Sequence, residues 1–438
     1  MTSRALRSQL RQWYPLALVF LTVGLSTSMA YPFLALFLTT AVHADPLRVS
    51  VYLVTGPVAG VVVAQLIGRL SDRRHWRRRL LITAAIAGVA AMSVNALSRD
   101  YWVLLAVVAT LSAVAGSMMS QGFAYARTVL AGSNRAAMTA SALRMLFSLA
   151  WVGGPPAAAL IQSRGGFSAL YATAAGMYAA AMIVVLALLP EPAPARDPHQ
   201  RPPAEPVPVD GATGPVAPGH DTGRAGTDRP ADAADANGTA APLANRDAPF
   251  LTIAGTIVAF VLLQGASTVG VQMLSLFLET DLHAGVGQAG LILGLCAGLE
   301  IPLMLTFGAL STRIPLRRLI LFGPLFSVAY LLLAATAHHT WVLFAGQLLN
   351  AMSIAAVQGL GVSYVQDMMP RHPGKASALY GNSFAAGTVM SGPLIAGAET
   401  FGYRTAYAIA AGICLVGFAL IAVSGPPRSR TAAEEQPA

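Results

Sequence analysis

The sequence contains few charged residues and almost no cysteine. Asp, Glu, Lys and Arg make up 11% of the 438 residues, whereas soluble proteins carry about 25%. The two cysteines, Cys296 and Cys414, lie inside apolar stretches, which argues against a disulfide framework or a cysteine-ligated metal. No catalytic triad, metal cluster or nucleotide-binding loop is recognisable. We therefore expect no enzyme activity, no cofactor and no bound metal.

Apolar residues dominate the composition. They account for 55% of the chain, and the mean hydropathy is +0.60, which is typical of a membrane protein. The net charge of +9 could indicate a nucleic-acid partner. The arginines that carry this charge, however, cluster at the ends of apolar stretches, where they act as topology signals. The expected surroundings are a lipid bilayer, and no nucleic-acid partner is expected.

Twelve apolar stretches are long enough to cross a bilayer as helices, which takes roughly 20 residues each. The first is too long for the apolar core of a signal peptide. The sequence thus predicts an all-α membrane protein with twelve transmembrane helices, at about residues 14–38, 49–70, 80–98, 102–126, 136–160, 167–189, 250–278, 286–310, 319–337, 341–366, 375–398 and 403–424.

The chain repeats itself after about 240 residues. Residues 34–45 read LALFLTTAVHAD and residues 274–285 read LSLFLETDLHAG. His43 and His283 are a matched pair that we interpret as relics of the repeat. A parallel repeat of this kind predicts two similar halves with a binding site at the seam between them.

The repeat and the composition divide the chain into four parts. Residues 1–189 and 248–424 are the predicted six-helix halves. Residues 190–247 are rich in Pro, Ala, Gly and Asp and hold too few large apolar residues to form a core, so they are predicted to be a disordered cytoplasmic linker. Residues 425–438 are the expected cytoplasmic tail.

The orientation follows from the positive charges of the short loops. Lys and Arg concentrate on the side that holds both termini, and the opposite loops hold only Arg48, Arg99, Arg164 and Arg404. Because positively charged loops stay in the cytoplasm, both termini are predicted to be cytoplasmic, in the cytoplasmic (inner) membrane.

A basic motif, GRLSDRRHWRRR at residues 68–79, follows the second span. Gly68 would let two helices approach closely, while Asp72 could accept hydrogen bonds from a helix N-terminus or pair with Arg127. Together with Arg73, these residues are the predicted cytoplasmic gate. Alternatively, the arginines of the motif only set the topology. The second copy has Thr312 in place of the aspartate and should gate weakly.

The motif and the six-plus-six layout resemble the major facilitator superfamily, and that resemblance implies its fold. Gly154-Pro155 in the fifth span and Gly392-Pro393 in the eleventh are predicted helix kinks. A Gly-Pro break in the fifth span resembles the signature of exporters in the superfamily. A generic transmembrane kink is the alternative.

Three segments carry a narrower resemblance: SALRMLFSLAWVGGPP at residues 141–156, GLEIP at 298–302 and YVQDMMP at 364–370. They look like the bacterial sugar efflux transporter family. That resemblance implies proton-driven export of sugars and sugar-like molecules, including lactose, glucose and thiogalactosides.

Arg144 and Glu300 are the ionisable residues deepest in the apolar spans. Charges at bilayer depth are costly and normally face a cavity or a partner. Arg144 is a candidate donor to sugar hydroxyls, and Glu300 a candidate sugar acceptor or proton carrier. Arg144 could instead extend to the membrane surface, and Glu300 could form a structural ion pair.

Uncharged polar residues and one aromatic complete the predicted substrate site. Amides without charge suit a neutral polyol, although they could also serve helix-to-helix hydrogen bonding. The predicted substrate-binding residues are Arg144, Trp151, Gln264, Thr268, Gln272, Glu300, Asn350 and Asn382. A multidrug efflux proton antiporter and a non-transporting membrane receptor or scaffold are the alternative functions. The chain is expected to act as a monomer.

Overall fold

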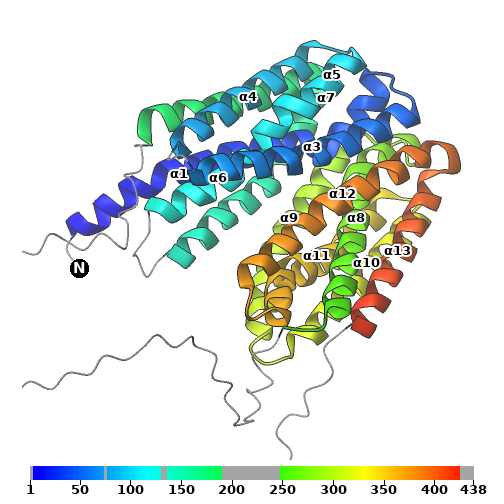
Figure 1. Cartoon of the computed structure of the whole chain (residues 1–438). Helices are drawn as coiled ribbons and strands as arrows, with labels where there is room; N and C mark the ends of the chain where they lie inside the picture. Colours follow the sequence, from blue (N-terminus) through cyan, green and yellow to red (C-terminus); the bar gives the residue numbers. More distant parts are fainter. Residues whose placement is uncertain (1–2, 74–75, 130–135, 190–246, 425–438) are drawn as a thin grey trace, which may run out of the picture. The chain divides into compact units, whose positions relative to one another are not determined.

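The computed structural model describes residues 3–73, 76–129, 136–189 and 247–424. Side chains are described throughout these ranges except at residues 3–13, 71–73, 127–129, 136–142 and 144. All regular elements in the described ranges are helical, as the apolar stretches predict (Figure 1).

The first half of the chain begins with α1, which is followed by a short irregular segment rather than a straight continuation. Pro32 lies in that segment and has no N–H to donate, so the α-helical hydrogen-bond ladder is interrupted there. The elements of this half are α1 (Ser3–Ala30), η1 (Tyr31–Phe33), α2 (Leu34–Leu36), η2 (Phe37–Ala41), α3 (Pro46–Arg73), α4 (Arg77–Leu97), α5 (Tyr101–Val107), η3 (Val108–Ser112), α6 (Ala113–Val129) and α7 (Ala136–Leu188).

The second half consists of six long helices joined by short turns. They are α8 (Phe250–Thr280), α9 (Val286–Leu310), α10 (Leu316–Thr336), α11 (Thr340–Met368), α12 (Pro373–Phe401) and α13 (Tyr403–Ser424).

Ten helices in the described ranges are long and apolar enough to cross a membrane, whereas the sequence predicts twelve spans. Two features account for the difference. Helix α7 counts as one span although it covers two predicted ones, and Gly166 breaks it with a φ of 66°. Helix α12 has the length of a span, but its many Gly, Ser and Thr residues make it less apolar than the ten helices counted. The structure is therefore consistent with twelve crossings.

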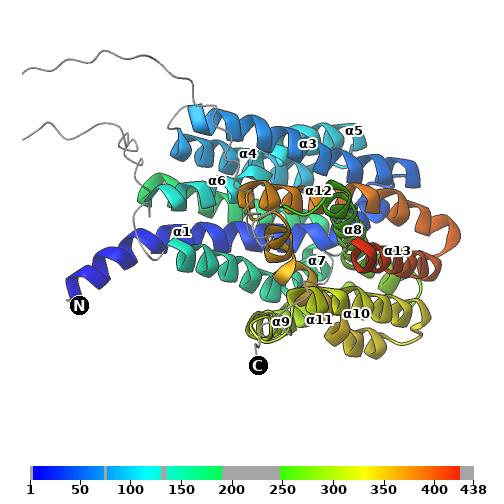
Figure 2. The same cartoon turned by 60° about the horizontal axis from the view of Figure 1, so that its bottom comes forward.

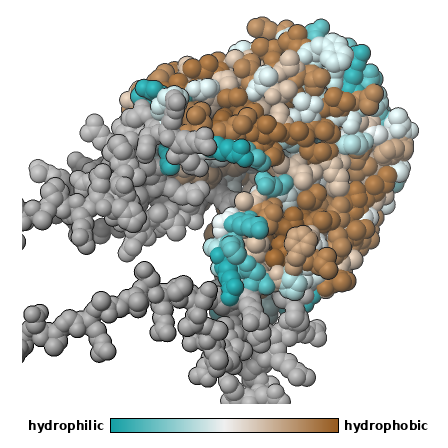
Figure 3. Space-filling view, in the orientation of Figure 1, coloured by the Kyte–Doolittle hydropathy of each residue, from teal (hydrophilic) through white to brown (hydrophobic). Residues whose placement is uncertain are grey.

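Many large hydrophobic side chains face outward, such as Leu305, Phe322 and Val423. The space-filling view shows a face covered largely by hydrophobic residues (Figure 3). A soluble protein rarely exposes apolar surface on this scale, whereas a protein surrounded by lipid does so over its whole belt.

The repeat in the sequence is also a repeat in backbone geometry. His43 and His283 both adopt left-handed conformations, with φ of 54° and 48°. Each ends a helix in the same way, because the next N–H bonds back to Leu38 O at 2.9 Å in one copy and to Leu278 O at 2.8 Å in the other. The paired histidines thus mark equivalent helix ends.

Successive helices run in opposite directions, so each half has two ends. We name the end that holds Arg78, Arg317 and Lys375 the basic end, and the end that holds His43, His283 and Arg404 the far end. At the basic end Arg78 donates to Leu186 O at 2.8 Å, and Arg317 donates to Ala422 O at 2.7 Å. These arginines bind helix C-terminal carbonyl oxygens, so they hold the first turns of α4 and α10 against the ends of α7 and α13.

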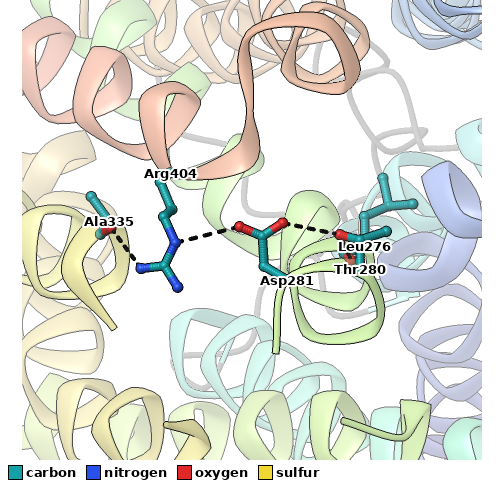
Figure 4. A network of polar contacts seen from close by, with 5 residues as sticks. All are labelled: Leu276, Thr280, Asp281, Ala335 and Arg404. Atoms are coloured by element: carbon teal, nitrogen blue, oxygen red, sulfur yellow. Dashed lines mark hydrogen bonds and ion pairs between the residues drawn. The ribbon is translucent and has the colours of Figure 1, made fainter. Parts of the chain in front are cut away.

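At the far end of the second half, Arg404 ties three helices together (Figure 4). Its Nε lies 3.5 Å from Asp281 Oδ2 at the end of α8, and its Nη1 donates to Ala335 O of α10 at 3.3 Å. In the first half Arg99 donates to Asn95 O, which is the position equivalent to Ala335 in the repeat. Arg99 and Arg404, which are not equivalent in the repeat, therefore bind equivalent carbonyl oxygens in the two halves.

The two halves contact each other through α7 against α9 and through α3 against α12 (Figures 1 and 2). Gly290 of α9 lies against the carbonyl oxygen of Pro155, so closely that a methyl group there would collide with it. Gly392 of α12 lies against α3, where an added methyl would be 3.2 Å from Val54 Cγ2. Small residues thus allow close helix approach across the seam.

These cross-half contacts lie in the far-end portions of the helices. Ser275 of α8 adds a hydrogen bond to Pro32 O at 3.2 Å, which is also near the far end. At the basic end, Gly68 and Gly308 have open space where a side chain would begin. At these two positions no close packing between helices is made.

The predicted linker lies outside the described residues except for its last residue, Asp247. Asp247 Oδ2 is 2.7 Å from His372 Nδ1, and its Oδ1 accepts the N–H of Arg371 at 3.1 Å. The hydrogen bond from His372 is the main reason that the pKa of Asp247 lies below its usual value. Asp247 thereby fixes the start of α8 to the turn between α11 and α12.

Deleting about residues 195–241 is expected to leave transport close to the intact chain's rate. The deleted composition cannot build a core, while Asp247 and its contacts with the α11–α12 turn are retained. The measurement is uptake into vesicles, normalised to inserted protein. A large loss of activity in correctly inserted protein would contradict the expectation.

Candidate substrate site

The break after α1 brings an aromatic side chain to the seam. Tyr31 is the first residue of η1, and its ring centroid is 6.3 Å from that of Trp151 on α7, with the rings inclined at 68°. Both side chains are partly exposed. Trp151, a predicted site residue, thus has an aromatic partner that the sequence analysis did not single out.

The hydroxyl group of Tyr31 reaches the second half. It is buried and lies near the side chains of Gln272 and Thr268 on α8 and of Thr388 on α12. None of these neighbours is placed for a well-formed hydrogen bond to it, and the Oε1 atom of Gln272 is also buried without a partner. The seam therefore contains polar groups whose hydrogen-bonding capacity is unused.

Gln264, one helical turn before Thr268, extends this polar face along α8. Its backbone carbonyl accepts the Thr268 hydroxyl at 2.9 Å, and its Nε2 approaches the Tyr380 hydroxyl at 3.4 Å. Its Oε1 is buried without a partner. The structure thus brings Trp151, Thr268 and Gln272 together around Tyr31, and Gln264 lies one turn beyond Thr268 on the same helix.

Asn350 belongs to a different polar cluster, inside the second half. Its amide nitrogen donates to Gln347 Oε1 at 3.1 Å and lies 3.4 Å from Cys296 Sγ. Gln347 in turn donates to the Tyr330 hydroxyl at 3.2 Å. The amide of Asn350 therefore joins α9, α10 and α11, which is the helix-bonding alternative that the sequence left open.

Glu300 is half-buried on α9. Among the described residues, no ion pair or hydrogen bond to its carboxylate is formed. It lies one turn after Cys296 and so shares the face of α9 that meets Asn350 of α11. Gly294 and Gly298 mark the other face, which contacts α7. Glu300 is thus oriented toward α11 more than toward α7.

Several predicted residues lie outside the described side chains or away from the seam cluster. The side chain of Arg144 is not among those described, and neither are those of Asp72, Arg73 and Arg127. Asn382 on α12 is exposed. The close helix packing predicted at Gly68 is not made in this conformation, since no heavy atom lies within 4 Å of the position that a Cβ atom would take there.

The two glycines of the predicted kinks, Gly154 and Gly392, allow close helix packing. A methyl group on Gly154 would lie 2.9 Å from Ser28 Cβ, so α7 and α1 meet there without room for a side chain. Gly392 similarly allows α12 to approach α3 across the seam. Pro155 and Pro393 lie inside α7 and α12, which continue through them.

Sequence reasoning missed Tyr31 and Thr388. The available signal was the Tyr31-Pro32 pair inside an otherwise uniform apolar span, because a proline there predicts a break that redirects the preceding side chain. Thr388 lies in a helix whose polar residues are spread around its whole circumference, so no single face stood out.

Comparison with known families agrees with this arrangement of helices. The Major Facilitator Superfamily profile matches residues 16–268 and 255–438. The chain belongs to the major facilitator superfamily. It is therefore a multi-pass membrane transporter and not an enzyme. The resemblance seen in the sequence motifs is confirmed.

Relatives within the superfamily span nearly the whole chain. A putative sugar efflux transporter of Deinococcus radiodurans is 33% identical over 93% of this chain and 96% of its own length. Sugar efflux transporter A of Dickeya chrysanthemi is 31% identical over 90% of this chain and 91% of its own length. Sugar efflux transporter B of Salmonella typhimurium is 30% identical, with 90% of each chain covered.

Solved structures of other transporters share the fold. A crystal structure of the nucleoside transporter NupG superposes with a TM-score of 0.70 at 14% identity, covering 95% of this chain and all of that one. The peptide transporter POT in complex with sulfate gives a TM-score of 0.70 at 13% identity, with 94% of each chain covered. At these identities the likeness concerns the fold alone.

Proposed function

We propose that this transporter exports neutral sugars or sugar-like molecules from the cytoplasm in exchange for protons. The observation that carries the proposal is the seam region around Trp151 and Gln272, where uncharged amides and hydroxyls lie beside two aromatic rings. Sugars present hydroxyl groups along their edges and C–H groups on their faces, and such a lining matches both. The names of the relatives point to the same substrate class.

The contacts between the halves support transport by alternating access. They lie toward the far end, while Gly68 and Gly308 at the basic end meet nothing. If the basic end faces the cytoplasm, as the positive charges favour, this conformation is closed to the outside. The opposite conformation would separate the far-end contacts and close the basic end, where Gly68, Asp72, Arg73 and Arg127 are the proposed gate.

The remaining parts of the mechanism are assigned as follows. The two six-helix halves move about the seam in the cytoplasmic membrane, both termini remain cytoplasmic, and one chain suffices. Arg144 donates to substrate hydroxyls from α7. Glu300 exchanges the proton, because it is a carboxylate at bilayer depth that no described residue neutralises.

The test is counterflow in reconstituted vesicles with and without a pH gradient. Labelled lactose should exchange, and a pH gradient should accelerate its movement, while ethidium should not compete. Ethidium movement without lactose exchange would overturn the proposal in favour of a multidrug exporter. Lactose exchange that ignores the pH gradient would leave sugar transport in place and remove the coupling to protons.

A further inference from the structure

The hydroxyl of Tyr31 and three side chains of the second half form a small polar patch within the seam. We name Tyr31, Thr268, Gln272 and Thr388 the Tyr31 patch. Gln272 is 1% exposed, Thr268 4% and Thr388 6%, so these three side chains are shielded from solvent, whereas the Tyr31 side chain is partly exposed. The Tyr31 hydroxyl and Gln272 Oε1 are both buried without a hydrogen-bond partner.

Such a patch is unfavourable unless something fills it. A buried polar atom without a partner loses its hydration and gains nothing in return, and proteins normally avoid this. The two unpartnered atoms belong to different halves, Tyr31 to the first and Gln272 to the second. A single group that bound both atoms would therefore reach both sides of the seam.

The chemistry of the patch indicates which kind of group could bind both atoms. The Tyr31 hydroxyl and the two threonine hydroxyls can donate or accept, and Gln272 Oε1 accepts. All four members are uncharged, so they suit a neutral group that both donates and accepts. A hydroxyl group does this. The rings of Tyr31 and Trp151 lie beside the patch and offer apolar surface to the carbon atoms that carry such a group.

The helix break explains why Tyr31 occupies this place. In a straight α1 the chain would continue its α-helical path through residue 31, but Pro32 interrupts the ladder and η1 follows. Pro32 O then accepts from Ser275 of α8 at 3.2 Å, so the break itself is attached to the second half. Tyr31 is thereby held at the seam by the residue that follows it.

We propose that the Tyr31 patch is a subsite for one hydroxyl group of a neutral sugar, which bridges the two halves when bound. This inference rests on the proposed function and deepens it, because it names Tyr31 and Thr388 as substrate contacts. It also links substrate occupancy to the seam, since the ligand supplies hydrogen bonds between halves that the protein alone leaves unmade.

The test is equilibrium binding of labelled lactose and glucose to the purified full-length chain. Tyr31→Phe and Gln272→Leu should each weaken binding about tenfold, as expected for one lost hydrogen bond to an uncharged group. Because both contact the same hydroxyl, the double variant should bind no more weakly than the weaker single variant. Tyr171→Phe is the matched control, since it removes an equally buried, unpartnered hydroxyl in the core of the first half.

Monodeoxy-glucoses separate a substrate contact from a structural role. Wild type should bind one deoxy-glucose of the series about tenfold more weakly than it binds glucose. The Tyr31→Phe variant should bind glucose and that deoxy-glucose with equal affinity. Equal binding of sugar by wild type and both variants would overturn the subsite, leaving the patch to water. Additive losses would also overturn it, because two separate hydroxyls would then be involved. A wild type that binds neither sugar would overturn the proposed function itself.

Discussion

Glu300→Gln is expected to abolish the acceleration of sugar efflux by a pH gradient while sugar exchange without a gradient continues. Glu300 is half-buried in α9, and no described residue pairs with its carboxylate. Such a group can bind and release a proton as the two conformations expose it in turn. Glutamine has nearly the shape of the protonated acid but cannot release a proton, so exchange survives and coupling is lost.

The size of the effect follows from the gradient. If one proton moves per sugar, one pH unit supplies about 1.4 kcal/mol, which corresponds to a tenfold sugar ratio at steady state. Wild type should approach that ratio in vesicles, whereas Glu300→Gln should show none. Glu279→Gln, at an exposed position near the end of α8, is the matched control and should behave like wild type. Unchanged accumulation by Glu300→Gln would remove Glu300 as the proton carrier.

The relation of Glu300 to Arg144 is decided by measuring sugar affinity and pH-driven efflux for both single variants and for the double variant. Arg144→Ala should weaken sugar affinity, because its guanidinium is proposed as a hydroxyl donor. If the two residues act only as an ion pair, the double variant should be no worse than either single variant. The face of α9 that carries Glu300 is directed toward Asn350 and α11 rather than toward α7, so we expect the two losses to be separate.

The fold could be predicted because bilayer physics is simple. Apolar length located most of the helices, and the repeated segments at residues 34–45 and 274–285 both end in a left-handed histidine, His43 and His283. Composition fails where a helix is shielded by its neighbours. Helix α12 has the length of a span, but its composition alone does not identify it as one. Its polar residues Ser383, Thr388 and Ser391 can be tolerated because they are buried against protein rather than exposed to lipid.

The site was predicted only in part, for a related reason. A polar side chain in a span indicates a neighbour or a cavity but does not say which. Thr268 and Gln272 lie at the seam, whereas Asn350, of the same residue class, bonds Gln347 within the second half. Tyr31 escaped notice because its position depends on a backbone break. Which polar residue faces the seam is decided by helix rotation, and helix rotation is set by packing.

Gly290→Val is expected to shift the transporter toward the conformation that is open at the far end and to slow transport severely. In the present conformation a Cβ atom at position 290 would lie 2.6 Å from Ala159 Cβ and would also meet the carbonyl oxygen of Pro155. Neither atom can move without displacing α7. Overpacking of this kind costs about 1–3 kcal/mol, which corresponds to a change of roughly 5- to 150-fold in the equilibrium between two states. Separating α9 from α7 at the far end relieves it.

The shift can be measured with a reporter at the far-end seam. Ser275 is fully buried beside Pro32, so Ser275→Cys, with both native cysteines replaced by alanine, should react slowly with a membrane-impermeant maleimide. Adding Gly290→Val should raise the labelling rate by the factor that the equilibrium changes. Gly287→Val is the matched control, because it places the same side chain on α9 where nothing lies within 4 Å. Equal labelling and equal transport in the two valine variants would show that the Gly290 contact does not close the far end.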